Sequence, residues 1–73
     1  MRVIINGWQE GFGKVAMTKL QVEMLGLGLK EAKENVEAIL EYEAVEIEVA
    51  DLDIAKEFVE KSVELGAVAT IIQ

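Results

Sequence analysis

Apolar and polar residues recur with two different periods along this chain, and the changes of period predict a series of short elements. Arg2–Asn6 is expected to form a strand that ends at an Asn-Gly pair, a dipeptide favoured where φ must be positive. Gly7–Gly13 (GWQEGFG) is expected to be a loop. Over Lys14–Leu25 the apolar spacing becomes helical, and Gly26 is placed to end that helix.

The next segment predicts a second helix followed by a strand. Leu29–Leu40 has helical spacing, with one apolar stripe made of Leu29, Ala32, Val36, Ile39 and Leu40. Val45–Val49 alternates strictly between apolar and acidic residues, which indicates a strand with one buried face and one face in water. A sheet covered on one side only is therefore expected.

A third helix and a last strand complete the pattern. Asp51 or Asp53 can cap this helix, and Gly66 can end it. One apolar face is expected to hold Ile54, Ala55, Phe58, Ser62 and Leu65. Ala67–Ile72 then reads as a strand. The order β-α-α-β-α-β predicts a single α+β domain over residues 1–73, with three helices packed on one face of a three-stranded antiparallel sheet.

Composition excludes several classes of protein. The chain has 73 residues, 52% of them apolar, and no proline, which argues against a disordered tail. It has no cysteine and no histidine, so neither a disulfide scaffold nor a zinc site is expected, and we expect no metal and no cofactor. The apolar run within Met1–Asn6 is too short for a signal peptide or a membrane span. We therefore expect a cytoplasmic protein that does not associate with a membrane.

The net charge of −7 argues against nucleic acid as a partner, because phosphate binding needs clustered lysine and arginine. The acidic residues concentrate between Glu31 and Glu64. Four of the seven basic residues instead lie in the first two predicted helices, at Lys14, Lys19, Lys30 and Lys33. This asymmetry makes the helical region of the first half a candidate binding surface.

The first predicted helix has two apolar stripes. At 100° per residue, one side holds a core stripe of Ala16, Met17, Leu20 and Met24. A different side holds Val15, Val22 and Leu25 together with Thr18, flanked by Lys14 and Lys19. Three interpretations stay open: the second helix covers this stripe, the stripe forms a homodimer, or it binds a partner protein. Apolar residues bordered by charge favour a binding face.

A resemblance to a known family rests on the segment from Gly26 to Lys33, which reads GLGLKEAK. Together with Lys14-Val15-Ala16 and Lys19 upstream, this segment resembles the C-terminal domain of the bacterial ribosomal stalk protein, the acidic seven/twelve-type protein of the large subunit. The likeness runs without a gap from position 14 to position 33. Looser matches follow at Val36-Glu37, Asp53, Ala55, Phe58 and Gly66-Ala67.

This resemblance implies a three-stranded antiparallel sheet with three helices, and a non-catalytic protein-binding function. The family's domain recruits translational GTPases such as the elongation factors, through its first two helices. Carried over by position, the implied protein-binding surface comprises Lys14, Val15, Thr18, Lys19, Val22 and Lys33. The chain departs from the family at two of these positions: Thr18 replaces an aliphatic residue, and Val22 replaces an arginine. The second change removes a bidentate contact that an arginine can make with a carboxylate and a valine cannot.

The family protein also has an N-terminal dimerisation segment and a hinge, whereas this chain begins at the predicted strand. We therefore expect that it is not tethered to the ribosome in the stalk's way. Two roles stay open: a decoy for translation factors and a repurposed binding module. A related fold is found in the bacterial protease adaptor that recognises N-terminal degradation signals. The adaptor uses an Asn-Asp pair and a histidine, whereas this chain has Asn6-Gly7 and no histidine. An adaptor-like function is therefore kept as the alternative on likeness of fold alone.

No motif predicts catalysis. The segment Gly11–Lys14 resembles a fragment of a phosphate-binding loop, but Val15 stands where that motif needs serine or threonine. The carboxylates near Asp51 are better explained by helix capping than by a calcium loop. We expect no enzyme. Trp8 and Phe12 are expected to close one end of the small core rather than to contact a partner.

Overall fold

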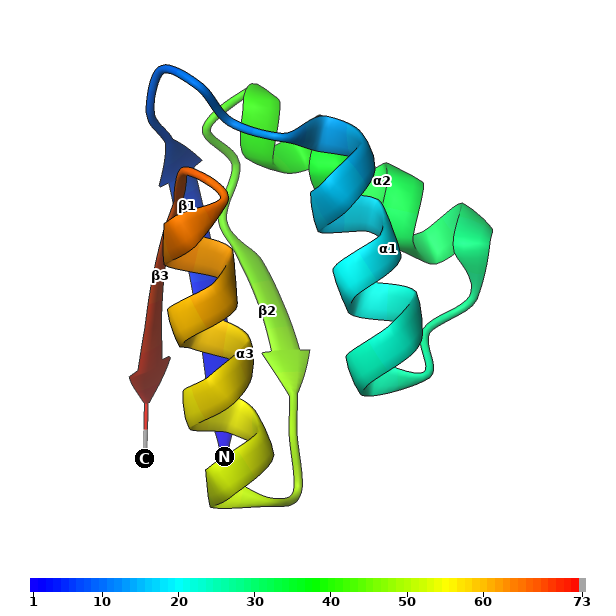
Figure 1. The fold of residues 1–73 in the computed structure, drawn as a ribbon, viewed down its shortest axis with the longest axis vertical. Coiled ribbons are helices and arrows are strands. Elements are labelled where there is room, and N and C mark those ends of the chain that lie inside the picture. The colour runs from blue at the N-terminus through cyan, green and yellow to red at the C-terminus, as the bar shows by residue number, and fades with distance from the viewer. Residues whose placement is uncertain (73) are drawn as a thin grey trace.

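The computed structural model describes residues 1–72 and has six elements in the order expected from the sequence. They are β1 (Arg2–Trp8), α1 (Lys14–Leu25), α2 (Leu29–Leu40), β2 (Val45–Glu48), α3 (Leu52–Glu64) and β3 (Ala67–Ile72). The strands form one antiparallel sheet in the order β2-β1-β3. In Figure 1, α3 lies over the sheet, while α1 and α2 pair with each other on the β2 side of the molecule. The α+β fold is therefore the one predicted.

The central strand β1 is longer than predicted because it continues through a β-bulge. Ile5 lies opposite Ala69, but Gly7 lies opposite Val68, so one extra residue of β1 stands between the two pairs. A bulge reverses the alternation of faces beyond it. Trp8, opposite Ala67, thereby returns to the helix-facing side that Ile5 occupies. The prediction that the strand ends at position 6 and that a loop begins at Gly7 was wrong for this reason.

The aromatic residues close one end of the core. The indole N–H of Trp8 donates to the carbonyl oxygen of Leu40 at 3.0 Å. The Trp8 ring stacks on Tyr42, with centroids 5.9 Å apart, and lies 6.3 Å from the ring of Phe12. Both Trp8 and Phe12 are partly buried and pack against the core, as expected. Tyr42 has a φ of 61°, which is uncommon for a bulky residue, and its ring is the one that stacks on Trp8.

Helix termini follow the residues that the sequence singled out. Gly26 has a φ of 69° and donates its backbone N–H to Val22, which ends α1. Of the two candidate caps for α3, the structure uses Asp51: its Oδ1 accepts from the backbone N–H groups of Asp53 at 2.8 Å and Ile54 at 3.1 Å.

The core lies between the sheet and the helices, and its largest fully buried residue is Phe58. Three residues that were predicted to be in the core are exposed: Ala16, Leu29 and Ile54. On α1 the buried residues are Met17 and Gln21. Successive residues are 100° apart around a helix, so a buried face centred on these two residues leaves Ala16 outside it. Leu29 and Ile54 lie in the first turns of their helices, and burial begins at Ala32 and Ala55.

Ser62 gives a first test of this core. Its side chain is fully buried, and its Oγ has no hydrogen-bond partner among the described residues. Ser62→Ala is expected to raise the free energy of unfolding by about 1–2 kcal/mol, because it removes an unsatisfied hydroxyl and alanine favours a helix. Urea unfolding measures this change.

The reverse substitution is the matched control. Ala55 is buried seven residues earlier on the same face of α3. Ala55→Ser introduces a buried hydroxyl and is expected to lower the free energy of unfolding by about 1–3 kcal/mol. A loss of stability in Ser62→Ala would contradict the assignment of an unsatisfied hydroxyl.

Candidate protein-binding surface

The rotation of α1 decides which of its residues face solvent. Met17 and Gln21 are fully buried, so the side of α1 opposite to them faces solvent. Val15 is 70% exposed, and Lys19 is exposed as well. Val22 is only partly buried. The second apolar stripe is therefore open at Val15 and partly covered at Val22.

A hydrogen-bonded pair of amides joins α1 to α2 and sets this rotation. Gln21 Nε2 donates to the carbonyl oxygens of Met17 at 3.2 Å and Ala32 at 3.1 Å. Gln21 Oε1 accepts from Asn35 Nδ2 at 2.9 Å. The sequence interpretation missed Gln21, because a polar residue within an apolar run was not assigned to the core. Its position four residues after Met17 was the signal that would have found it.

Thr18 is occupied within its own helix. Its Oγ1 donates to the carbonyl oxygen of Lys14 at 3.0 Å, which is the back-bonding common for threonine in helices. The residue is partly buried. The hydroxyl hydrogen of Thr18 is therefore committed to the backbone of α1 and is not free for another acceptor.

Lys33 lies in an open groove along α2. The groove has a volume of about 540 Å³ and is lined by Leu29, Lys30, Lys33, Glu34 and Glu37. Leu29 is 57% exposed, and it gives the groove an apolar end beside the lysines. The sequence interpretation placed Leu29 in the core and so missed it as a surface residue. Its place as the first residue of α2, directly after Gly28, was a signal of exposure.

Lys19 lies in a different hollow, between α1 and α3. This hollow has a volume of about 340 Å³ and is lined by Ala16, Lys19, Leu20, Glu23, Lys61, Glu64 and Leu65. None of the α1 positions predicted for binding lines the groove that contains Lys33. The structure therefore distributes the six predicted residues over the surface of the α1–α2 pair rather than gathering them in one cavity.

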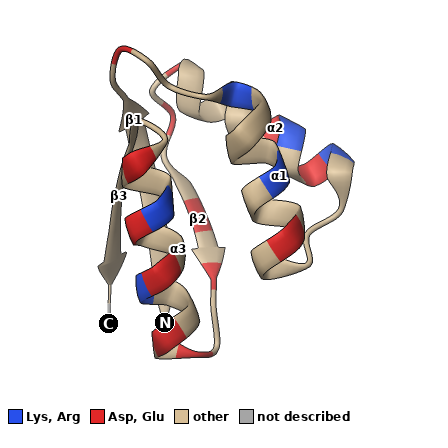
Figure 2. Ribbon diagram, viewed as in Figure 1, with Lys and Arg blue, Asp and Glu red and all other residues tan. Residues whose placement is uncertain are grey.

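Charge divides the molecule into two parts. Residues 14–40 contain four lysines and four glutamates, whereas the rest of the chain contains three basic and ten acidic residues. Figure 2 shows lysines along α1 and α2, and acidic residues along β2 and much of α3. The α1–α2 pair is thus neutral within a strongly acidic protein.

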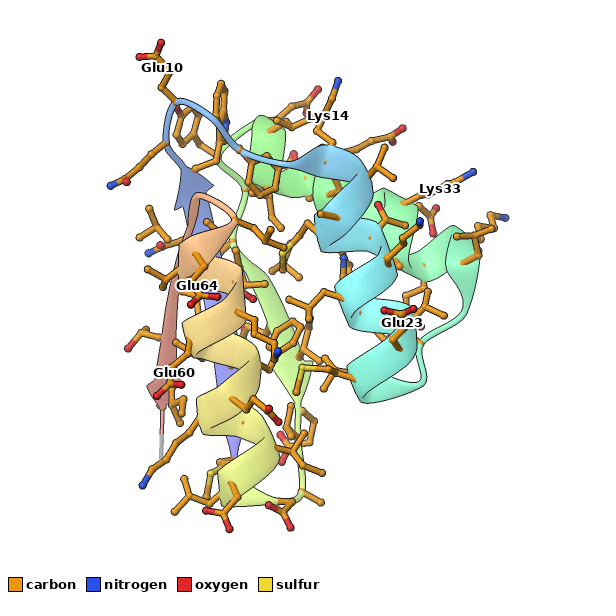
Figure 3. The ribbon with its side chains drawn as sticks, in the orientation of Figure 1. Glu10, Lys14, Glu23, Lys33, Glu60 and Glu64 are labelled. Atoms are coloured by element: carbon orange, nitrogen blue, oxygen red, sulfur yellow. The ribbon has the colours of Figure 1, made fainter. Side chains whose placement is uncertain are left out.

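Among residues 1–72, the lysine ammonium groups have no ion-pair partner. Within residues 1–72 the ion pairs are those of the Met1 amino group with Glu48 and of Arg2 with Glu46. Figure 3 shows Lys14 and Lys33 extending from α1 and α2 away from the sheet. Both side chains are therefore available to carboxylates of another molecule.

Among residues 1–72, no three side chains of the metal-ligating types lie together in a way that would hold an ion. No helix in the same part of the chain has the length and apolar character needed to cross a membrane.

Comparisons with models of protein families, with curated proteins and with solved structures found no match. The resemblance to the ribosomal stalk domain therefore rests on the residues from Lys14 to Lys33 that carry it.

Proposed function

We propose that this chain is a non-catalytic, cytoplasmic protein-binding module that docks translational GTPases through α1 and the start of α2. The observation that carries the proposal is the exposure of Val15 and Leu29 beside lysines that have no ion-pair partner among residues 1–72. Exposed apolar side chains bordered by charge are typical of surfaces that bind proteins. The GTPase as partner comes from the resemblance of Gly26–Lys33 and Lys14–Lys19 to the stalk domain.

Charge supports the choice of face. A partner with an acidic surface is repelled by β2 and α3, which carry many glutamates, but it meets a neutral region with four lysines at α1 and α2. Such a distribution orients an encounter before contact and raises the association rate. Apolar contact at Val15 and Leu29 then supplies affinity once water is excluded.

Lys19→Glu is expected to weaken binding of a GTP-loaded elongation factor about tenfold, because it reverses a charge at the edge of the surface. Lys19 is exposed and unpaired in the described structure, so the fold should not change. Titration of the ¹⁵N-labelled chain with the factor gives both the affinity and the residues whose signals shift.

Ala44→Glu is the control, since it adds a carboxylate at an exposed position of the loop between α2 and β2, outside the groove that contains Lys33 and the hollow that contains Lys19. It should leave the affinity within about twofold of the original value. Signal shifts confined to β2 or α3, or no shifts at all, would reject the proposed function.

A further inference from the structure

The two edges of the sheet are protected to different degrees. The edge strand β2 carries Glu46 and Glu48, which pair with Arg2 and with the amino group of Met1. The other edge, β3, reads AVATII and contains no charged residue and no proline. Charges on an edge strand prevent pairing with a second molecule, and their absence leaves the edge available. β3 is therefore the open edge.

Apolar side chains are exposed on and beside β3. Val68 is 42% exposed and Ile72 is 39% exposed, both on the sheet face away from the core. On α3, which packs against β3, Val63 is 53% exposed. Figure 3 shows Glu60 on the β3 side of α3, and helical spacing places Lys56 four residues earlier on that same side. Exposed apolar side chains therefore flank the β3 edge on both faces of the sheet, and on the α3 face two opposite charges lie beside them.

We propose that a second copy of this chain pairs with β3 in antiparallel orientation, about a two-fold axis at Thr70, so that the two sheets join into one of six strands. A two-fold axis makes an interface self-complementary. In this register Thr70 faces its own copy, and Val68 faces Ile72 of the other chain on both sides of the axis. Such pairs of aliphatic residues are favourable on neighbouring antiparallel strands. The exposed residues Val68 and Ile72 thereby become a contact.

Charges on α3 match in the same register. The turn at Gly66 reverses the chain, so α3 runs back along β3. At 1.5 Å per helical residue, Glu60 lies about 9 Å and Lys56 about 15 Å from that turn, and at 3.3 Å per strand residue Thr70 lies about 13 Å from it. Rotation about the two-fold axis at Thr70 places Glu60 of the second chain about 17 Å from the Gly66 turn of the first chain. This is nearly level with Lys56 of the first chain.

Two reciprocal Lys56–Glu60 pairs therefore flank the axis, and among residues 1–72 neither side chain has an ion-pair partner within its own chain. These pairs oppose the repulsion between two chains of net charge −7. The rim of β3 faces away from the α1–α2 pair in Figure 1, so the interface is independent of the proposed docking surface.

The mass in solution tests the proposal. Sedimentation equilibrium is expected to give about 16 kDa at high concentration, twice the 8.0 kDa of one chain. Thr70→Lys should raise the dimer Kd at least about tenfold, because it places two ammonium groups on the axis. Ala44→Lys is the control: it is exposed, it lies in the α2–β2 loop, and it adds the same charge without changing the Kd.

A mixing experiment identifies the two charges. Lys56→Glu and Glu60→Lys should each weaken self-association, because each variant places two like pairs across the axis. Mixed in equal amounts, the two variants should form a heterodimer at least as tight as the original dimer, seen by native mass spectrometry. A monomer at about 1 mM, a dimer that Thr70→Lys leaves intact, or a mixture that shows no gain over its components would overturn the proposal.

Discussion

Gly66→Ala is expected to lower the free energy of unfolding by about 4 kcal/mol, from about 1–3 kcal/mol of backbone strain and about 1–3 kcal/mol of steric overlap. Gly66 has a φ of 95°, which residues with a Cβ rarely adopt. A Cβ at this position would lie 2.9 Å from the Cα of Phe12 and 3.2 Å from its backbone nitrogen. Backbone atoms cannot rotate away as a side chain does. For 73 residues, about 0.05–0.15 kcal/mol per residue makes this loss a large part of the total stability.

Gly11→Ala separates the two causes of this loss. Gly11 has a φ of 90°, close to that of Gly66, but a Cβ added there would meet no atom of residues 1–72 within 4 Å. Its alanine variant is expected to show only the strain, about 1–3 kcal/mol. Urea unfolding followed by the fluorescence of Trp8 measures both. Equal losses in the two variants would mean that the close approach of Phe12 contributes nothing.

The close approach at Gly66 also positions the start of α1. Gln9 donates its backbone N–H to Gly66 at 2.8 Å, and Gly13 donates to Leu65 at 3.0 Å. These bonds attach the loop before α1 to the turn between α3 and β3. We therefore expect Gly66→Ala to shift the amide signals of Lys14 and Val15, which belong to the proposed docking surface.

Gln21→Glu is expected to lower the free energy of unfolding by about 3–5 kcal/mol at pH 7, since it buries a carboxylate beside two carbonyl oxygens. Gln21 is fully buried, and its Nε2 donates to the carbonyl oxygens of Met17 and Ala32. A charged carboxylate has no hydrogen to donate, and only the Asn35 amide remains to pair with it. Charge is therefore introduced where acceptors already face the side chain.

The loss should depend on pH. Below about pH 4 the introduced carboxyl group is protonated and can again donate to a carbonyl, as the amide does. The folded state then holds this proton more tightly than the unfolded state, so the variant becomes less stable relative to the original chain as the pH rises from about 4 to about 7. Urea unfolding of both proteins at each pH gives the difference.

Gln21→Met is the control, because it keeps the length of the side chain and adds no charge. Its loss is expected to be about 1 kcal/mol, for the missing hydrogen bonds, and to be the same at both pH values. A difference between Gln21→Glu and the original protein that does not change with pH would show that the side chain at position 21 reaches water.

The positions of the helices and strands follow from local patterns. The alternation in Val45–Glu48 and the helical spacing in Leu29–Leu40 both report which side of an element is apolar, and such periods do not depend on the rest of the chain. Gly26 and Gly66 mark helix ends because their positive φ is a property of a single residue. The order of six elements, and with it the α+β fold, was therefore predictable.

The candidate surface was predictable only in part. The exposure of Lys14, Val15 and Lys19 agrees with the side of the helix on which the sequence placed them. The exposure of Leu29 does not, since the apolar stripe of α2 assigned that residue to the core. Periodicity gives the apolar side of a helix but not how far along its length the neighbouring elements reach, and the core stops short of the first turn of α2.

Sequence alone determined the identity, order and approximate limits of the elements, because each depends on neighbours a few residues apart. Tertiary structure decided the bulge between Ile5 and Gly7, which depends on the strand paired with β1. It also decided the burial of Gln21, which depends on Ala32 and Asn35 of another helix. Contacts between distant parts of the chain set the rotation of α1, and so they also determined which of its residues meet solvent.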